Sequence, residues 1–223
     1  LAHNVWECRT LKKAANYYNI VSQMGNQGHT TNGVRQIKEW YEAGILGEVK
    51  EVHAWIGTLD FRPGHYWTLP ESFPPSKQQV PEHLNWDLWL GPAKYRDYNQ
   101  VYAPKSWRGF FDFGNGQLGD WSCHTLDGPF WALNLGMPNE VESYVPKQIN
   151  KHHFVSEQSI VSYKFPANKK RSPVSMKWYE GGLKPELDPD WPIKELERSG
   201  MIMVGSKCSL ITCLLYTSPS PRD

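Results

Sequence analysis

Two acid–base side chains stand one helical turn apart in the stretch 116–127, which reads GQLGDWSCHTLD. If this stretch is a helix, Asp120 and His124 lie on one face, and Asp127 shares that face. A carboxylate one turn from an imidazole can orient the ring, fix its tautomer and raise its pKa, as a general acid–base catalyst requires. Spacing alone leaves one alternative open, a charged helix surface with no chemical role.

A second group of polar side chains comes after a short apolar segment, Ile20–Met24, which we predict to be a strand. The turn after it begins with Gly25 and contains Asn26, Gln27 and His29. Ligands of open α/β sheets bind beyond the carboxyl ends of strands, so we expect these side chains to line a binding site. The alternative is a polar turn that caps the next helix.

Three other motifs are interpreted as structural. The stretch Gly114–Gly119 spells GxGxxG, but the preceding FFDF is not the buried, β-branched strand that a dinucleotide fingerprint requires. His152 and His153 are adjacent, so on a strand they would point to opposite faces, and no metal site is expected. Cys123 and the histidine after it do not face each other on a helix, which disfavours a nucleophile–base pair.

The composition is that of a folded domain. The 223 residues include 39% hydrophobic and 21% charged residues, enough for a packed core. The net charge of +1 argues against a nucleic-acid surface, and no apolar run is long enough to span a membrane. The four scattered cysteines form no CxxC pair, which favours free thiols. The 11 tryptophans suit core packing or a cleft that stacks on sugar rings.

Periodicity predicts helices and then strands, the order of an α+β domain with an antiparallel sheet. The segment 59–106 is irregular, which is typical of a functional loop or lid, and contains one short helical turn near 86–90. The expected helices span 5–18, 31–43 and 116–135, and the expected strands beyond the first span 48–58, 140–145, 159–165, 174–179 and 201–204.

Three segments, in order and spacing, resemble the Gfo/Idh/MocA family of oxidoreductases. Residues 1–4 and the helix after them resemble the segment that follows the family's Glu-Lys-Pro motif. Gly44–Val49 resembles its G-x-x-G-x-[VI] segment before the C-terminal sheet. The stretch 116–127 resembles its Gly-rich D-x-x-x-H helix, with Trp107 and Arg108 at the expected place upstream.

The resemblance implies an α/β architecture in two domains, truncated at both ends. Residues 1–27 would be the end of a Rossmann-like dinucleotide-binding domain. Residues 28–212 would be an α+β substrate domain with an open, mostly antiparallel sheet, and 213–223 a non-native tail. The full-length protein would be an NAD- or NADP-dependent enzyme acting on a hydroxyl or carbonyl carbon of a sugar, cyclitol or related compound. This piece alone would be inactive.

The resemblance also implies site roles. His124 would act as base or as part of a Lys–His relay whose lysine precedes Leu1, and Asp120 would orient His124 or hold a sugar hydroxyl. Residues implied to bind substrate are Asn26, Gln27, His29, Trp107 and Asp127; those implied to bind the cofactor are Gly25, Asn26, Trp107 and Arg108.

Two other functions fit the sequence: an NAD-assisted glycosidase of the same family and a non-catalytic sugar-binding module. The paired acid and base weigh against pure binding. The expected partners are a small sugar-like molecule and further copies of the same chain, with no nucleic acid and no membrane. The cytoplasm is favoured as compartment, and the periplasm is the alternative.

Overall fold

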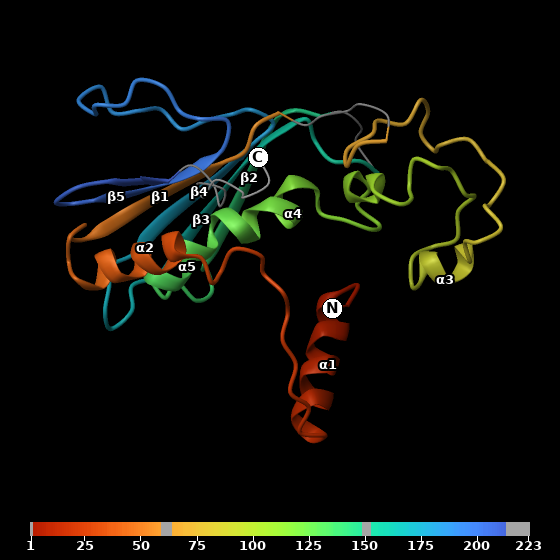
Figure 1. Ribbon diagram of the computed structural model, residues 1–223, viewed down its shortest axis with the longest axis horizontal. Coiled ribbons are helices and arrows are strands. Elements are labelled where there is room, and N and C mark those ends of the chain that lie inside the picture. Colours follow the sequence, from red (N-terminus) through yellow and green to blue (C-terminus); the bar gives the residue numbers. More distant parts are fainter. Residues whose placement is uncertain (1, 59–63, 149–152, 213–223) are drawn as a thin grey trace.

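A computed structural model describes residues 2–58, 64–148 and 153–212, so the expected tail at 213–223 and His152 lie outside the described residues. Its centre is a six-stranded sheet in the order β2-β3-β4-β1-β5-β6 (Figure 1). Only β1 and β4 are parallel, so the sheet is mostly antiparallel and open, as the sequence predicted. The strands are β1 (Val49–Trp55), β2 (Glu140–Lys147), β3 (Gln158–Phe165), β4 (Val174–Glu180), β5 (Gly200–Gly205) and β6 (Leu210–Thr212).

Helices cover one face of this sheet and a loop covers the other (Figure 1). Residues alternate between the two faces of β1: Val52 joins the core beneath the helices and Trp55 joins the core beneath the loop. Ile37 belongs to the first core, while Leu196 of the 181–199 loop belongs to the second. The helices are α1 (Val5–Tyr17), α2 (Asn32–Glu42), α3 (Trp86–Leu90), the 3-10 turn η1 (Ser106–Gly109), α4 (Gly116–Thr125) and α5 (Asp127–Ala132).

The long irregular segment has an aromatic core of its own. Trp86, Tyr102 and Phe110 are buried there together with Phe154, and the Trp86 indole donates a hydrogen bond to the Arg96 carbonyl at 2.7 Å. Among the described residues Trp55, Trp67, Trp86 and Trp178 are buried, so core packing, the first of the two expected explanations, accounts for part of the tryptophan content. The predicted helical turn is α3, which Asn85 caps by accepting from Leu88 N at 3.0 Å.

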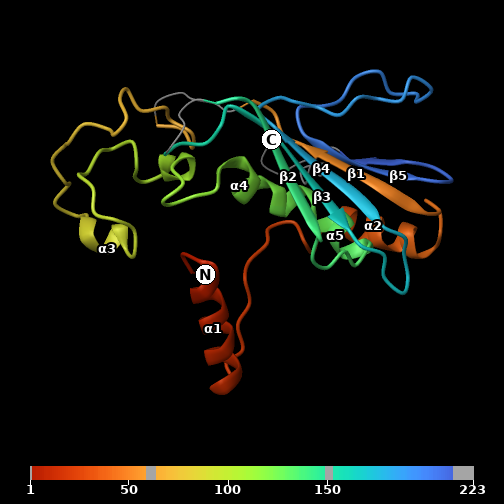
Figure 2. The same cartoon turned by 180° about the vertical axis from the view of Figure 1, so that it is seen from behind.

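The predicted strand Ile20–Met24 is wrong. The segment is extended but pairs with no strand among the described residues, and its side chains are exposed, Val21 to 99%. A strand needs a neighbour to satisfy its backbone groups, and the sheet lies away from this segment. Helix α1 before it forms as predicted, with Asn4 accepting from Glu7 N, but buries no residue and stands apart from the sheet (Figures 1 and 2).

The single helix predicted over 116–135 is two helices. Helix α4 ends at Thr125 and α5 begins at Asp127, with Leu126 between them. Pro129 explains the break, because it has no N–H to donate to the Thr125 carbonyl four residues earlier. The short β6 was also missed; three residues carry too little alternation to predict a strand.

Candidate functional site

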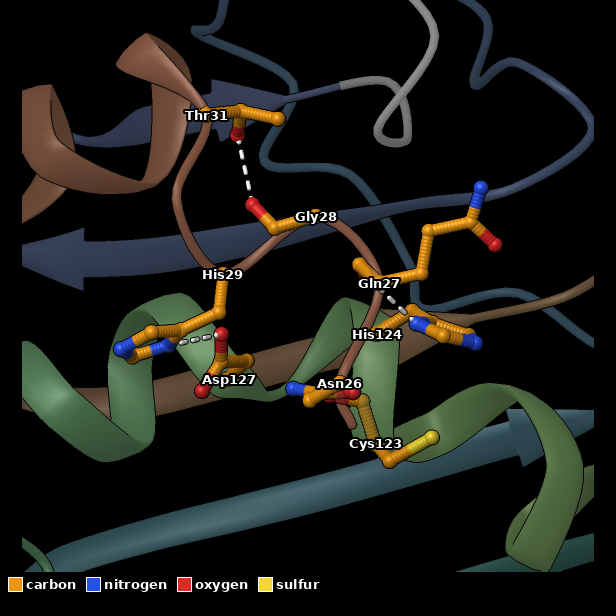
Figure 3. Close-up of polar contacts among 8 residues, drawn as sticks. All are labelled: Asn26, Gln27, Gly28, His29, Thr31, Cys123, His124 and Asp127. Atoms are coloured by element: carbon orange, nitrogen blue, oxygen red, sulfur yellow. Dashed lines mark hydrogen bonds and ion pairs between the residues drawn. The ribbon is translucent and has the colours of Figure 1, made fainter. Parts of the chain in front are cut away.

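The turn after Gly25 is joined to α4 by two hydrogen bonds (Figure 3). Asn26 Nδ2 donates to the Cys123 carbonyl at 3.1 Å. His124 Nδ1 lies 2.9 Å from the Gln27 carbonyl oxygen. Two segments nearly a hundred residues apart in sequence thus form one polar surface.

The backbone contact fixes the tautomer of His124. A carbonyl oxygen can only accept, so Nδ1 must carry the hydrogen. In the neutral ring the lone pair is therefore on Nε2, which has no hydrogen-bond partner among the described residues. An imidazole arranged in this way can take a proton at Nε2 while Nδ1 holds it in place.

A third contact lies one turn further along, at the start of α5. His29 Nδ1 and Asp127 Oδ2 are 2.7 Å apart, with the Asp127 side chain 18% exposed (Figure 3). The His29 ring also lies against Trp131, with centroids 5.0 Å apart. Asp127 thus contacts the turn rather than His124, and it shares the surface by way of His29.

Asp120 is paired with Arg108 instead of His124. Arg108 Nε lies 3.2 Å and 3.3 Å from the two carboxylate oxygens, and both side chains are partly buried. The guanidinium also lies over the rings of Tyr66 and Trp107, at 4.5 Å and 4.6 Å from their centroids. Within the described residues no hydrogen bond joins Asp120 to His124, so the spacing brings the two to one helix without making them partners.

Cys123 is unsuited to act as a nucleophile. Burial raises the pKa of its thiol, and the negative charge of Asp120 raises it further. The thiol therefore stays protonated at neutral pH, and its Sγ points back to the Asp120 carbonyl at 3.7 Å. The geometry agrees with the expectation that Cys123 and its neighbour do not form a catalytic pair.

Two residues that the sequence did not single out form buried polar contacts beside α4. Buried Gln117 donates to the Gly57 carbonyl at 3.1 Å and accepts from Gly181 N at 3.2 Å, which ties the helix to the ends of the parallel strands β1 and β4. Glu180 at the end of β4 accepts from Ser159 at 2.6 Å, and burial raises its pKa. Their partners are too far along the chain for periodicity to reveal.

The GxGxxG stretch is packed against the chain itself. A Cβ on Gly114 would lie 2.8 Å from Arg108 Cα, and one on Gly116 would lie 2.7 Å from Val155. The residues before it form an isolated antiparallel bridge between Phe110 and Phe154, not a parallel strand. These glycines serve close packing and do not form a pyrophosphate loop.

A mostly apolar hollow of about 330 Å³ lies behind the same helices, between them and the sheet. Cys123 and Asp127 line it together with Phe130, Tyr163 and Met176. No group of three His, Cys, Asp or Glu side chains in the described ranges could hold a metal ion. Over the same ranges, no helix is long and apolar enough to cross a membrane.

The open sheet, with helices on one face and a polar helix–turn surface beside it, is an α/β domain. The family model described as "Oxidoreductase family, C-terminal alpha/beta domain" matches residues 30–167. The chain belongs to the Gfo/Idh/MocA family of oxidoreductases. No curated protein sequence matches the chain.

Several solved structures share the fold, two of which are dehydrogenases in complex with their ligands. One is the WlbA dehydrogenase from Bordetella pertussis in complex with NADH and UDP-GlcNAcA. It superposes with a TM-score of 0.55 at 14% sequence identity, and the match covers 94% of this chain and 49% of that protein. The other is the WlbA dehydrogenase from Chromobacterium violaceum with the same two ligands. Its TM-score is 0.55 at 16% sequence identity, and the match covers 99% of this chain and 51% of that protein. The chain spans about half the length of these two proteins.

Proposed function

We propose that the full-length protein is an NAD- or NADP-dependent oxidoreductase that acts on a hydroxyl or carbonyl carbon of a sugar, cyclitol or related compound, with His124 as its base. The observation that carries this proposal is the bond from His124 Nδ1 to the Gln27 carbonyl, which leaves Nε2 free to take a proton. Oxidation of an alcohol carbon removes a hydride and a proton, and the nicotinamide, when bound, would accept the hydride.

His124 would take the hydroxyl proton at Nε2. The imidazolium so formed keeps its Nδ1–H bond to the Gln27 carbonyl, whose partial negative charge stabilises the added positive charge. In the reverse direction the same nitrogen returns the proton to the carbonyl oxygen. The turn thus holds the ring in one orientation during proton transfer.

The remaining site residues would bind and orient the two ligands. Arg108 is held by Asp120 through Nε, and its position over Tyr66 and Trp107 is suited to a phosphate of the cofactor. Asn26, Gln27, His29 and Asp127 would border the reacting sugar, and Gly25 the nicotinamide. The donor set therefore fits a dinucleotide and a polyol.

Residues 1–27 would belong to the dinucleotide-binding domain. Helix α1 buries no residue, and apolar side chains on it and after it are exposed: Trp6 to 73%, Tyr17 to 79% and Val21 to 99%. So much exposed apolar surface normally packs against a partner. A dinucleotide-binding domain packed on α1 would bring its cofactor next to the turn at Gly25.

The test is steady-state kinetics of the full-length protein and its His124→Ala variant on the same sugar. General-base help contributes about 10²–10⁴-fold, so kcat should fall by that factor while KM changes little. His83→Ala is the matched control, because His83 is exposed and lies outside the site. A kcat within about threefold of wild type with a raised KM would make His124 a binding residue.

The same assay distinguishes a dehydrogenase from the alternative, an NAD-assisted glycosidase, whose overall reaction is redox-neutral. A dehydrogenase reduces one nicotinamide for each sugar oxidised, whereas an NAD-assisted glycosidase releases product with no net change in nicotinamide absorbance. A pure binding module would show neither a net change in nicotinamide absorbance nor release of a new product.

A further inference from the structure

A cavity of about 620 Å³ lies within the long irregular segment, between residues 64–78 and 99–106. Its volume is in the range of small-molecule sites, about 300–1,000 Å³. Figures 1 and 2 show this segment on the side of α4 away from α5, and Ser106, the first residue of η1, is one of the cavity residues. None of the residues assigned so far to proton transfer lines it.

The walls of the cavity are held by their own hydrogen bonds. Asn99, only 8% exposed, donates to the Ser76 carbonyl at 2.7 Å and accepts from Val101 N at 2.8 Å. Gln100 N donates to Gln78 Oε1 at 2.8 Å, which joins the two stretches that face each other. The space is therefore formed before any ligand arrives, which lowers the entropy cost of binding.

The groups left over suit a neutral polyhydroxylated ligand. Gln100 and Ser76 are exposed at the cavity, and the Gln100 amide and the Ser76 hydroxyl, which have no hydrogen-bond partner among the described residues, can both donate to and accept from a ligand. One anion, Glu71, and one cation, Lys105, line the same space and balance each other. Proline rings such as Pro104 supply carbon surface between these groups.

The cavity connects to the candidate site through Lys105. Its carbonyl accepts from Arg108 Nη1 at 3.1 Å, and its Nζ lies 5.9 Å from the centroid of the Tyr66 ring that also contacts Arg108. Arg108 in turn holds Asp120 on the helix of His124. Contacts between side chains therefore link the cavity to Asp120, which lies one turn from His124 on α4.

We propose that this cavity is a subsite for a neutral sugar unit attached to the reacting sugar, so that the substrate is a disaccharide or longer saccharide rather than a free monosaccharide. The attachment to a reacting sugar rests on the proposed function, whereas binding of a neutral saccharide by the cavity does not. The Gln100 amide binds the hydroxyls of the distal unit, and the proline rings pack against its carbon face.

The test is calorimetric titration of the full-length protein with glucose, maltose, cellobiose and lactose. At least one disaccharide should bind ten times more tightly than glucose, and Gln100→Ala should weaken that binding at least fivefold. Gln79→Ala is the matched control, since Gln79 is exposed and does not line the cavity. Should Gln100→Ala fail to fold, Ser76→Ala provides the same comparison.

The proposal is overturned if no disaccharide binds, if the cavity variants bind as tightly as the control, or if glucuronate binds more tightly than every neutral sugar. Its failure is separable from that of the proposed function. Loss of turnover in His124→Ala with unchanged disaccharide binding in Gln100→Ala would overturn the subsite alone. Disaccharide binding that depends on Gln100, without any redox turnover in the full-length protein, would leave the subsite and reject the proposed function.

Discussion

Arg108 Nε contacts both carboxylate oxygens of Asp120, at 3.2 Å and 3.3 Å. The carboxylate of Asp120 is thus paired with a residue twelve positions earlier in the sequence. His124, one turn after Asp120 on the same helix, is instead oriented by the Gln27 backbone carbonyl. Asp120 and His124, whose spacing predicted an acid–base pair, therefore have separate partners, and a substitution of each should have a different effect.

Asp120→Asn should raise the KM for the nicotinamide cofactor more than it lowers kcat for the sugar. The amide keeps the shape but loses the charge that holds Arg108, and a partly exposed ion pair contributes about 0.2–1 kcal/mol. We expect the KM for the nicotinamide cofactor of the full-length protein to rise about two- to fivefold, the factor that such an energy gives, with kcat nearly unchanged. Steady-state kinetics at saturating sugar measure both.

Asp112→Asn is the matched control, because Asp112 pairs with Arg96 in the same segment but does not contact Arg108. That variant should leave the cofactor KM at the wild-type value. A fall in kcat of more than about tenfold in Asp120→Asn, beyond what a partly exposed pair supplies, would instead place Asp120 on the reacting sugar.

The neutral form of His124 should carry its hydrogen on Nδ1. The Gln27 carbonyl can only accept, so this tautomer is the one compatible with the 2.9 Å contact. Two-dimensional ¹H–¹⁵N spectra of the histidine rings at pH 8 distinguish a protonated Nδ1 from a protonated Nε2. Exposed His83 is the internal reference, and a ring of His124 protonated at Nε2 would show that the Gln27 contact does not form.

Local patterns were sufficient where the structure depends on neighbours in sequence. The spacing of Asp120 and His124 placed them on one helix, and short apolar segments separated by polar or Pro/Gly-rich turns indicated five of the six strands of the sheet. The break between α4 and α5 was missed although its cause is local: Pro129 has no N–H to donate, yet the prediction carried one helix through it over 116–135.

The parts that could not be predicted depend on contacts between distant segments. Ile20–Met24 has the composition of a strand, yet a strand forms only where a partner is present. The two bonds of Gln117 reach residues 60 and 64 positions away, which no period in the sequence encodes. The pairing of Arg108 with Asp120 likewise depends on the path of η1 into α4.

Gly181→Ala should destabilise the fold more than Gly136→Ala. Both glycines have a left-handed backbone, with φ of +71° and +73°, where a side chain costs about 1–2 kcal/mol. At Gly136 the new Cβ meets nothing within 4 Å, so it shows the backbone cost alone. At Gly181 it would lie 1.9 Å from the Glu157 carbonyl oxygen, so the backbone must move and the Gln117 bond to Gly181 N is strained as well.

We expect Gly181→Ala to exceed Gly136→Ala by about 1–3 kcal/mol, the usual cost of overpacking. Urea unfolding of the two variants beside wild type measures the difference in the free energy of unfolding. Equal losses in the two variants would mean that the loop at Gly181 relaxes freely and does not fix the end of β4.

Stability should fall on mild acidification because of His53 on β1. Its Nδ1 lies 3.1 Å from the Tyr179 hydroxyl and its Nε2 lies 3.3 Å from Glu51. Burial lowers the pKa of this histidine; the Glu51 charge opposes the shift, and Lys177 adds to it. Burial also raises the pKa of Tyr179 to about 12, so the phenol stays neutral and cannot balance an imidazolium.

Proton linkage sets the sign of this effect. Between the ordinary histidine pKa, about 6.5, and the lower value in the fold, the unfolded chain holds a proton that the folded chain does not. The free energy of unfolding therefore decreases as pH falls from about 7 through that window, and it levels off once the folded histidine is protonated too.

Urea unfolding at intervals from pH 7.5 to pH 5 should show a shallower decrease for His53→Gln than for wild type. His83→Gln, at an exposed position, should keep the wild-type slope. If His53→Gln and wild type decrease in parallel, carboxylates elsewhere cause the pH dependence, and the Glu51–His53–Tyr179 contacts do not contribute to it.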